Sequence, residues 1–182
     1  MTYRESNTLR TPEEQMLLSK AVDYALADAL PNGLVGRRVF VDATNIDCVD
    51  KAYVTDAVKQ GLAAKGARLV DKTTESDAVV TVRVGMLATQ SGSTLIGLPT
   101  FKLPALVTAG GFETPEIALF KRATQDGLAK ISLTAYDNDT RDLLDRREGT
   151  ARTRFDRWSI LFVVNFNKTN VPELKTPPSS MK

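Results

Sequence analysis

The stretch that decides the fold class is RVFVDATNIDCVDKAYVTDAVKQGLAAKGARLV, residues 38–70. Residues 38–42 hold β-branched and aromatic side chains and predict a short strand. Residues 50–65 predict a helix, because apolar side chains recur on one face and Gly66 then ends the pattern. Residues 67–70 are typical of the next strand. The apolar face of the helix consists of Val54, Val58 and Leu62. This succession predicts helices packed on a sheet.

A second helix is predicted upstream, at residues 11–30. Thr11 is a good N-cap, Pro12 suits the first helical position, and Glu14 completes a capping box. The sequence Pro31-Asn32-Gly33 is typical of a helix end. The apolar stripe of this helix consists of Leu18, Val22, Ala25, Leu26 and Ala29. The stripe predicts a helix with one face in the core.

The sequence downstream of residue 70 predicts several more strands. Residues 78–84 and 128–136 alternate between apolar and polar side chains, as half-buried strands do. The pair Asp126-Gly127 predicts a hairpin turn between a strand at residues 117–120 and the strand that follows. The near-continuous apolar run at residues 158–166 predicts a central strand.

The charge-dense segment between these strands, residues 141–157, follows a turn predicted at residues 137–140. It fits either a strand with a polar outer face or a short helix. Its arginines could bind phosphate, but Asp142, Asp145, Glu148 and Asp156 are interleaved with them. We therefore expect a solvated, ion-paired face.

Together these elements predict an α+β fold: one mixed, largely antiparallel sheet, two helices packed on one face, and an irregular apolar insertion. Residues 1–10 are expected to form an N-terminal arm and residues 11–166 a single domain, with the insertion at residues 88–115. The Pro- and Ser-rich residues 167–182 are expected to form a flexible tail.

The composition argues against several classes of partner. The chain has 182 residues, 42% of them hydrophobic, and 24 basic against 22 acidic residues give a net charge of +2. So small a charge predicts no binding to nucleic acid and no electrostatic attraction to an anionic membrane. The chain has no histidine. That excludes His-based triads and the usual zinc sites, so we expect no enzymatic activity, no metal and no cofactor.

The segment VDATNIDCVD, between the first strand and its helix, could form a carboxylate site from Asp42, Asp47 and Asp50. The alternative is that Asp47 or Asp50 caps the helix while Asn45 forms an Asx turn, and we favour this alternative. Cys48 lies at the helix start and could be a reactive thiol. Packing as a small apolar side chain is the more common role.

The insertion is the candidate functional surface, because Lys102 is its only charge between Gly85 and Glu113. It could fold back over its own core or form an interface, since long apolar loops in small domains are often functional. Its prolines and glycines argue against insertion into lipid. We predict an interface with a partner or a second subunit, formed by Leu95, Ile96, Leu98, Phe101, Leu103, Leu106 and Phe112.

Several short motifs resemble those of known bacterial proteins. The order RVFVDA, YVTDAVKQGLAAKG and ARLVD, then SDAVV (residues 76–80) and DNDT (residues 137–140), is similar to envelope lipoproteins of the curli-secretion CsgG and penicillin-binding-protein activator LpoB type. The opening SNTLRTPEEQMLLSKAVDYAL resembles the start of a mature envelope lipoprotein. The resemblance covers roughly residues 6–166, and Cys48 does not occupy the place of a lipidation cysteine.

The resemblance implies a location in the periplasm or cell envelope, with membrane contact only through a lipid anchor that this chain does not carry. The expected function is a non-enzymatic assembly or scaffold protein that forms a homo-oligomer or docks an envelope partner through the insertion. The alternative is a small-molecule or glycan-binding module with a pocket under the insertion. A hydrolase based on Asp42, Asp47 and Asp50 is a third alternative.

Overall fold

The computed structural model describes residues 10–98, 102–103, 112–113, 117–160 and 164–172. The helices are α1 (Pro12–Ala29) and α2 (Lys51–Ala64), with a short 3-10 turn at Thr73–Glu75. The strands are β1 (Arg38–Asp42), β2 (Arg68–Leu69), β3 (Ala78–Leu98), β4 (Lys102–Leu103), β5 (Phe112–Glu113), β6 (Ile117–Asp137), β7 (Leu143–Ile160) and β8 (Val164–Thr169). No helix in this described part is long and apolar enough to cross a membrane.

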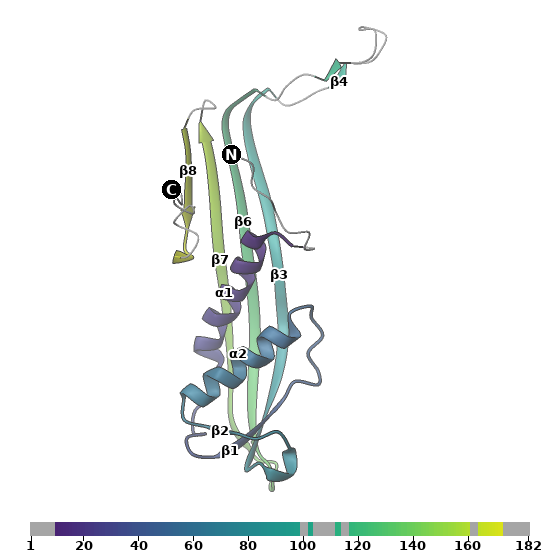
Figure 1. The fold of residues 1–182 in the computed structure, drawn as a ribbon, viewed down its shortest axis with the longest axis vertical. Coiled ribbons are helices and arrows are strands. Elements are labelled where there is room, and N and C mark those ends of the chain that lie inside the picture. The colour runs from purple at the N-terminus through teal and green to yellow at the C-terminus, as the bar shows by residue number, and fades with distance from the viewer. Residues whose placement is uncertain (1–9, 99–101, 104–111, 114–116, 161–163, 173–182) are drawn as a thin grey trace, which may run out of the picture. The chain divides into compact units, whose positions relative to one another are not determined.

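The main sheet is mixed and has the strand order β2-β1-β3-β6-β7-β8 (Figure 1). Strand β1 pairs in parallel with β2 and with β3, whereas β7 and β8 pair in antiparallel fashion. A separate antiparallel pair is formed by β4 and β5. A six-stranded sheet with two helices confirms the predicted α+β class.

The chain divides into two compact units. Unit 1 comprises residues 1–89 and 127–153, and unit 2 comprises residues 90–126 and 154–182. The long strands β3, β6 and β7 each contribute one part to each unit. The helices belong to unit 1, and β8 belongs to unit 2.

Unit 1 holds the main core, in which the predicted helix faces are buried. The Thr11 hydroxyl accepts a hydrogen bond from the Glu14 backbone, and the Glu14 carboxylate accepts one from the Thr11 backbone. The predicted capping box is therefore confirmed. Val54, Val58 and Leu62 of α2 are fully buried. They pack with α1 and with alternate residues of β6 at Ala129, Ile131, Leu133 and Ala135.

Glycines let helix α1 approach the strands of unit 1 closely. A Cβ added at Gly149 of β7 would overlap the carbonyl oxygen of Ala25 and lie 2.8 Å from its carbonyl carbon. A Cβ at Gly127 of β6 would lie 2.7 Å from the carbonyl oxygen of Leu17. Thr153 then donates a hydrogen bond of 2.7 Å to that same oxygen. At Gly127 and Gly149 the backbone of α1 therefore lies directly against β6 and β7, with no side chain between them.

The predicted turn at Asp126-Gly127 is wrong. Strand β6 runs without interruption from Ile117 to Asp137. Asp126 is 3% exposed and its carboxylate accepts a hydrogen bond from Arg154, so it is a buried ion-pair partner rather than a turn residue. Gly127 is required by the close approach of α1 and not by a turn.

The predicted single strand at residues 158–166 is also wrong. The run contains the end of β7 and the start of β8, which pair with each other so that Trp158 lies opposite Phe166. Both paired segments carry apolar side chains that contact one another, and the two segments are close in sequence. Residues 158–166 therefore have the sequence pattern of one central strand. In the described part of the sheet, β8 is instead an edge strand.

Three other boundaries differ from the prediction. Strand β3 extends to Leu98, so the first part of the predicted irregular insertion is strand. The ambiguous segment 141–157 lies mostly in β7. The predicted tail starts too early, because β8 continues to Thr169 and Val171 is fully buried.

Candidate functional site

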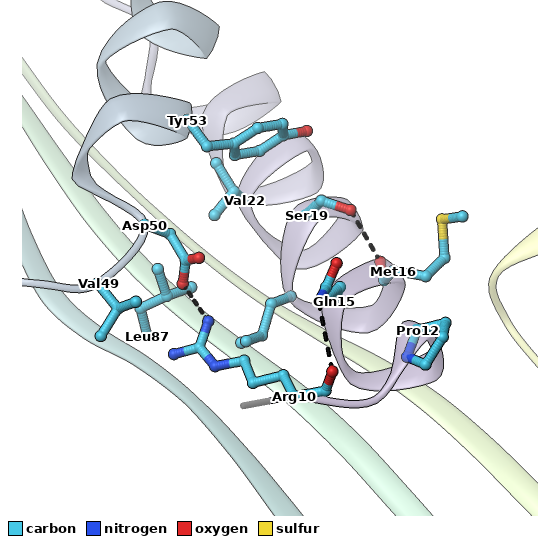
Figure 2. Close-up of a pocket in the computed structure, with 11 residues that line it drawn as sticks. Arg10, Pro12, Gln15, Met16, Ser19, Val22, Val49, Asp50, Tyr53 and Leu87 are labelled. Carbon is cyan, nitrogen blue, oxygen red and sulfur yellow. Dashed lines mark hydrogen bonds and ion pairs between the residues drawn. The ribbon is translucent and has the colours of Figure 1, made fainter. Parts of the chain in front are cut away.

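A cavity of about 700 Å³ opens in unit 1 beside the start of each helix (Figure 2). We call it the α1–α2 cavity. Helix α1 contributes one wall, the loop before α2 and its first turn contribute another, and β3 contributes Leu87. The lining residues are Arg10, Pro12, Gln15, Met16, Leu18, Ser19, Val22, Val49, Asp50, Tyr53 and Leu87.

Most of the cavity wall is apolar. Leu18 and Val22 lie at its base and are 3% and 1% exposed. Val49 and Tyr53 lie at its rim, and Val49 is 85% exposed. Val49 thus adds exposed apolar surface at the opening of the cavity.

The polar groups of the cavity are held by internal contacts. Arg10 forms an ion pair with Asp50, with Nη1 2.5 Å from Oδ2. The Tyr53 hydroxyl donates to Asp23 at 2.8 Å, and the Ser19 hydroxyl donates to the Met16 carbonyl oxygen. Burial, and then the hydrogen bond to Asp23, raises the pKa of Tyr53 to about 12. The phenol therefore stays protonated and keeps this contact at neutral pH.

The loop between β1 and α2 contains Asp42, Asp47 and Asp50, the residues of the alternative carboxylate site. No group of three His, Cys, Asp or Glu residues suited to a metal ion occurs among the described residues. Hydrogen bonds from the Thr44 side chain, and then from its backbone N–H at 3.0 Å, lower the pKa of the Asp42 carboxyl. Asp50 occupies the N-cap position of α2, but no side chain caps the helix there. The predicted capping by Asp47 or Asp50 is therefore wrong, because Asp50 pairs with Arg10 instead.

Cys48 has no sign of activation. Its side chain is half-buried against the core of unit 1. Burial raises the pKa of the Cys48 thiol, which disfavours the reactive thiolate. The structure therefore supports the packing role over the nucleophilic one.

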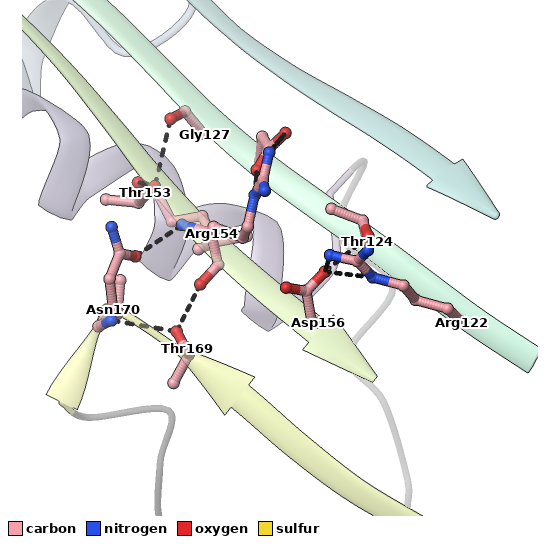
Figure 3. Close-up of polar contacts among 11 residues, drawn as sticks. Arg122, Thr124, Gly127, Thr153, Arg154, Asp156, Thr169 and Asn170 are labelled. Atoms are coloured by element: carbon pink, nitrogen blue, oxygen red, sulfur yellow. Dashed lines mark hydrogen bonds and ion pairs between the residues drawn. The ribbon is translucent and has the colours of Figure 1, made fainter. Parts of the chain in front are cut away.

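Two ion pairs join β6 and β7 in unit 2 (Figure 3). We call them the crossed ion pairs, because the arginine lies on β6 in one and on β7 in the other. Asp156 of β7 accepts hydrogen bonds from Arg122, at 3.0 Å, and from Thr124, at 2.6 Å. In the reverse direction, Arg154 of β7 donates to Asp126 of β6 at 2.8 Å. The carboxylate side chains are 7% and 4% exposed. These polar groups hold the two strands in register.

The predicted ion pairing of the arginine-rich segment is confirmed at these positions and at Arg147, which pairs with Asp145 at 3.1 Å. Lys130 and Glu148 form a further pair at 2.9 Å with both side chains almost half exposed. At these positions the charges of β7 are therefore paired, as expected for an ion-paired face.

An aromatic cluster follows the ion pairs along unit 2. Trp158 stacks on Phe166 of β8 and contacts Phe120 of β6 edge to face, each at 5.6 Å between centroids. The Arg122 guanidinium lies 4.6 Å from the centroid of the Trp158 ring. Aromatic and cation–π contacts of this kind add to the free energy of strand pairing.

Unit 2 ends in two sheet edges that no described strand covers. In the order β3-β6-β7-β8, the outer strands there are β3 and β8. Strand β1 pairs with β3 only at residues 78–81, which belong to unit 1. Large apolar side chains stay exposed on these edges: Ile96 of β3 is 59% exposed, and Val164 and Phe166 of β8 are 53% and 45% exposed.

The structure describes only part of the predicted interface. The side chains of Leu95 and Ile96 lie on β3 in unit 2, half-buried and exposed respectively. Leu98 ends β3, and Leu103 and Phe112 face each other in the register of β4 and β5. The side chains of these three, and all of Phe101 and Leu106, lie outside the described residues. The alternative pocket under the insertion does not coincide with the α1–α2 cavity as far as the insertion is described, since none of its described residues lines that cavity.

Two features of these sites were missed from the sequence. Arg10 and Val49 lie outside any periodic pattern, so nothing in the sequence indicated that they share a cavity with Tyr53. The ion pairs of unit 2, in contrast, could have been predicted from the spacing of residues in the sequence. Arg122, Thr124 and Asp126 are spaced two apart, as are Arg154, Asp156 and Trp158, and this spacing places each set on one face of its strand.

Comparison with known protein families places most of the chain in one family. The model of a family of unknown function, DUF6655, matches residues 4–162. No curated protein matches the sequence.

Proposed function

The chain belongs to this family of unknown function, and we propose that it is a non-enzymatic protein that self-associates through the edges of unit 2. The observation that carries the proposal is the pair of uncovered edges, at residues 90–98 of β3 and residues 164–169 of β8. An uncovered strand presents a row of backbone N–H and C=O groups that can pair with another chain.

Neither edge carries the usual protection against such pairing. Proteins block exposed edges with proline, with several charges or with a bulge. The β3 edge, residues 90–98, has no charged residue and no proline, and the β8 edge has Lys168 as its only charge. Ile96 and Phe166 add apolar surface that would be removed from water in a joined sheet.

The partner we propose is a second copy of the chain, joined head to tail, with β8 of one copy beside β3 of the next. Two different edges of one unit are open at once, and together they carry one charge, so no like charges oppose the pairing. Such a heterologous contact leaves one open edge at each end of a dimer. Assembly then continues until a ring closes or a filament grows.

The predicted interface on the insertion agrees with this arrangement. Leu95 and Ile96 belong to the β3 edge. We propose that Leu98, Phe101, Leu103, Leu106 and Phe112 extend the same interface beyond the strand. We also propose that both helices pack on one face of the sheet and that most strands are antiparallel.

We further propose a location in the periplasm or cell envelope, on the basis of the resemblance to envelope lipoproteins. Fractionation of the native cells tests this location. Recovery of the protein with the periplasmic or membrane fraction supports it, and recovery with the cytosolic marker overturns it.

Self-association is tested by multi-angle light scattering over a range of concentrations. We expect the wild-type mass to rise above that of one chain. Ile96→Lys and Val164→Lys should each lower the mass, because either change places a charge on an edge that must be desolvated. Leu143→Lys is the matched control, since Leu143 is also 59% exposed but lies in unit 1.

Two results would contradict the proposal. One is a wild-type chain that stays monomeric at every concentration. The other is an assembly whose mass falls as much with Leu143→Lys as with the two edge variants, which would place the contact outside unit 2.

A further inference from the structure

We propose that the α1–α2 cavity is a binding site for a small, uncharged and mostly apolar molecule. The inference goes beyond self-association and does not depend on it. Every residue that lines the cavity belongs to unit 1, whereas the proposed edges belong to unit 2.

The size and wall of the cavity suit a small ligand. Its volume of about 700 Å³ lies within the range of known ligand pockets, roughly 300–1,000 Å³. Such pockets are mainly apolar with a few polar groups that orient the ligand. Leu18, Val22 and Met16 provide a continuous apolar wall here, and Leu87 of β3 provides another part of it.

The charges around the cavity argue for an uncharged ligand. Among the described residues, the charged ones that line it are Arg10 and Asp50, which form an ion pair with each other. An anionic ligand would compete with Asp50 for Arg10, and a cationic ligand would compete with Arg10 for Asp50. Either would leave one half-buried charge without its present partner, which lowers the affinity for a charged ligand.

The polar contacts near the rim suggest how the ligand is oriented. The Tyr53 hydroxyl donates to Asp23 and also interacts with the Ser19 hydroxyl. Its oxygen has two lone pairs, so one of them can still accept a hydrogen bond from a ligand. A ligand with one hydroxyl or amine donor would meet this oxygen while its apolar body covers Val49. The class is therefore an apolar ring or chain compound with a single neutral polar group.

The test uses N-phenyl-1-naphthylamine, a neutral apolar amine whose fluorescence rises in apolar surroundings. We expect saturable binding with one site per chain. Ser19→Phe should abolish it, because the added ring would occupy the cavity from the wall of α1. Ala27→Phe adds the same ring at an exposed position of α1 outside the cavity and should leave binding unchanged.

A second variant keeps the test valid if Ser19→Phe does not fold. Val49 is 85% exposed, so Val49→Asp should not affect folding. It should weaken binding about tenfold, because an apolar contact at the rim is replaced by a charge. Ile96→Lys and Val164→Lys should bind the probe as the wild type does, which separates this site from the edges of unit 2.

The chemical class is tested with 8-anilinonaphthalene-1-sulfonate, which has the same ring system and a negative charge. We expect it to bind at least about tenfold more weakly than the neutral probe. Equal or tighter binding of the anion would overturn the assignment of an uncharged ligand. An absence of saturable binding, or binding that survives both Ser19→Phe and Val49→Asp, would overturn the site itself.

Discussion

Gly149 shows how one missing side chain determines where a helix lies. Its position on β7 faces the backbone of α1, and a Cβ there would overlap the carbonyl oxygen of Ala25. The contact cannot be relieved by a rotamer change, because the obstructing atoms are backbone. The helix would have to move away from the strand, and its buried residues would lose packing.

We therefore predict that Gly149→Ala lowers the free energy of unfolding by about 3 kcal/mol. Urea unfolding followed by far-ultraviolet circular dichroism measures the change. Gly92→Ala is the control, since nothing lies within 4 Å of a Cβ at Gly92. A Gly149→Ala protein as stable as the control would show that α1 does not rest on β7.

Asp156 represents the second kind of residue that determines stability, a buried charge with several donors. Its carboxylate is almost fully buried and accepts hydrogen bonds from Arg122 and Thr124. We predict that Asp156→Ala costs about 2 to 3 kcal/mol, because Arg122 and Thr124 both lose their acceptor. Glu148→Ala, which breaks the exposed pair with Lys130, should cost less than about 0.5 kcal/mol. Equal effects of the two substitutions on the urea midpoint would contradict this ranking.

Single residues were predicted from the sequence only where local chemistry decides their role. The Thr11–Glu14 capping box is local, and it was predicted correctly. Asp126-Gly127 has the local signature of a turn, but its role depends on Arg154 and Leu17, which lie far away in sequence. Long-range contacts of this kind override local turn propensity.

At the scale of elements, the parallel pair β1–β3 is joined by a charged clamp at its start. The Asp77 carboxylate accepts hydrogen bonds from the backbone N–H of Arg38, at 2.9 Å, and from its guanidinium, at 2.6 Å. The Asp77 N–H also donates to the Arg38 carbonyl oxygen. The bonds from Arg38 lower the pKa of Asp77 from 3.8 to about 2.

The contact between Arg38 and Asp77 makes the free energy of unfolding depend on pH in the acid range. Because the pKa of Asp77 is lower in the folded than in the unfolded chain, its contribution to stability is complete above pH 3.8. It is lost as the pH falls from 3.8 toward about 2. We predict that Asp77→Asn removes this part of the acid-induced loss of stability. A wild type and an Asp77→Asn protein with identical slopes of unfolding free energy against pH in that window would contradict the prediction.

Helices were better predicted than strands. The helical period and its caps are local, so α1 and α2 were located to within a few residues. Strand length depends on the neighbouring strand instead. The Gly- and Ser-containing residues 91–98 resembled a loop, yet they form part of β3, which lies beside β6.

At the scale of the whole molecule, the division into two units separates the two proposed activities. Unit 1 contains the helices, the main core and the α1–α2 cavity. Unit 2 contains the crossed ion pairs, the aromatic cluster and the two uncovered edges. The sequence predicted one domain with an apolar insertion, and it could not reveal the edges, because they exist only once the strand order is known.

The central claim, head-to-tail association of β3 with β8, is tested most directly by mixing two blocked chains. Ile96→Lys blocks the β3 edge and keeps an intact β8 edge, whereas Val164→Lys does the reverse and leaves the stacking of Phe166 on Trp158 in place. We predict that each variant alone is monomeric in sedimentation velocity, and that an equimolar mixture forms a dimer that grows no further. A mixture that sediments as two monomers, or an Ile96→Lys chain that dimerises alone through β8, would contradict the account.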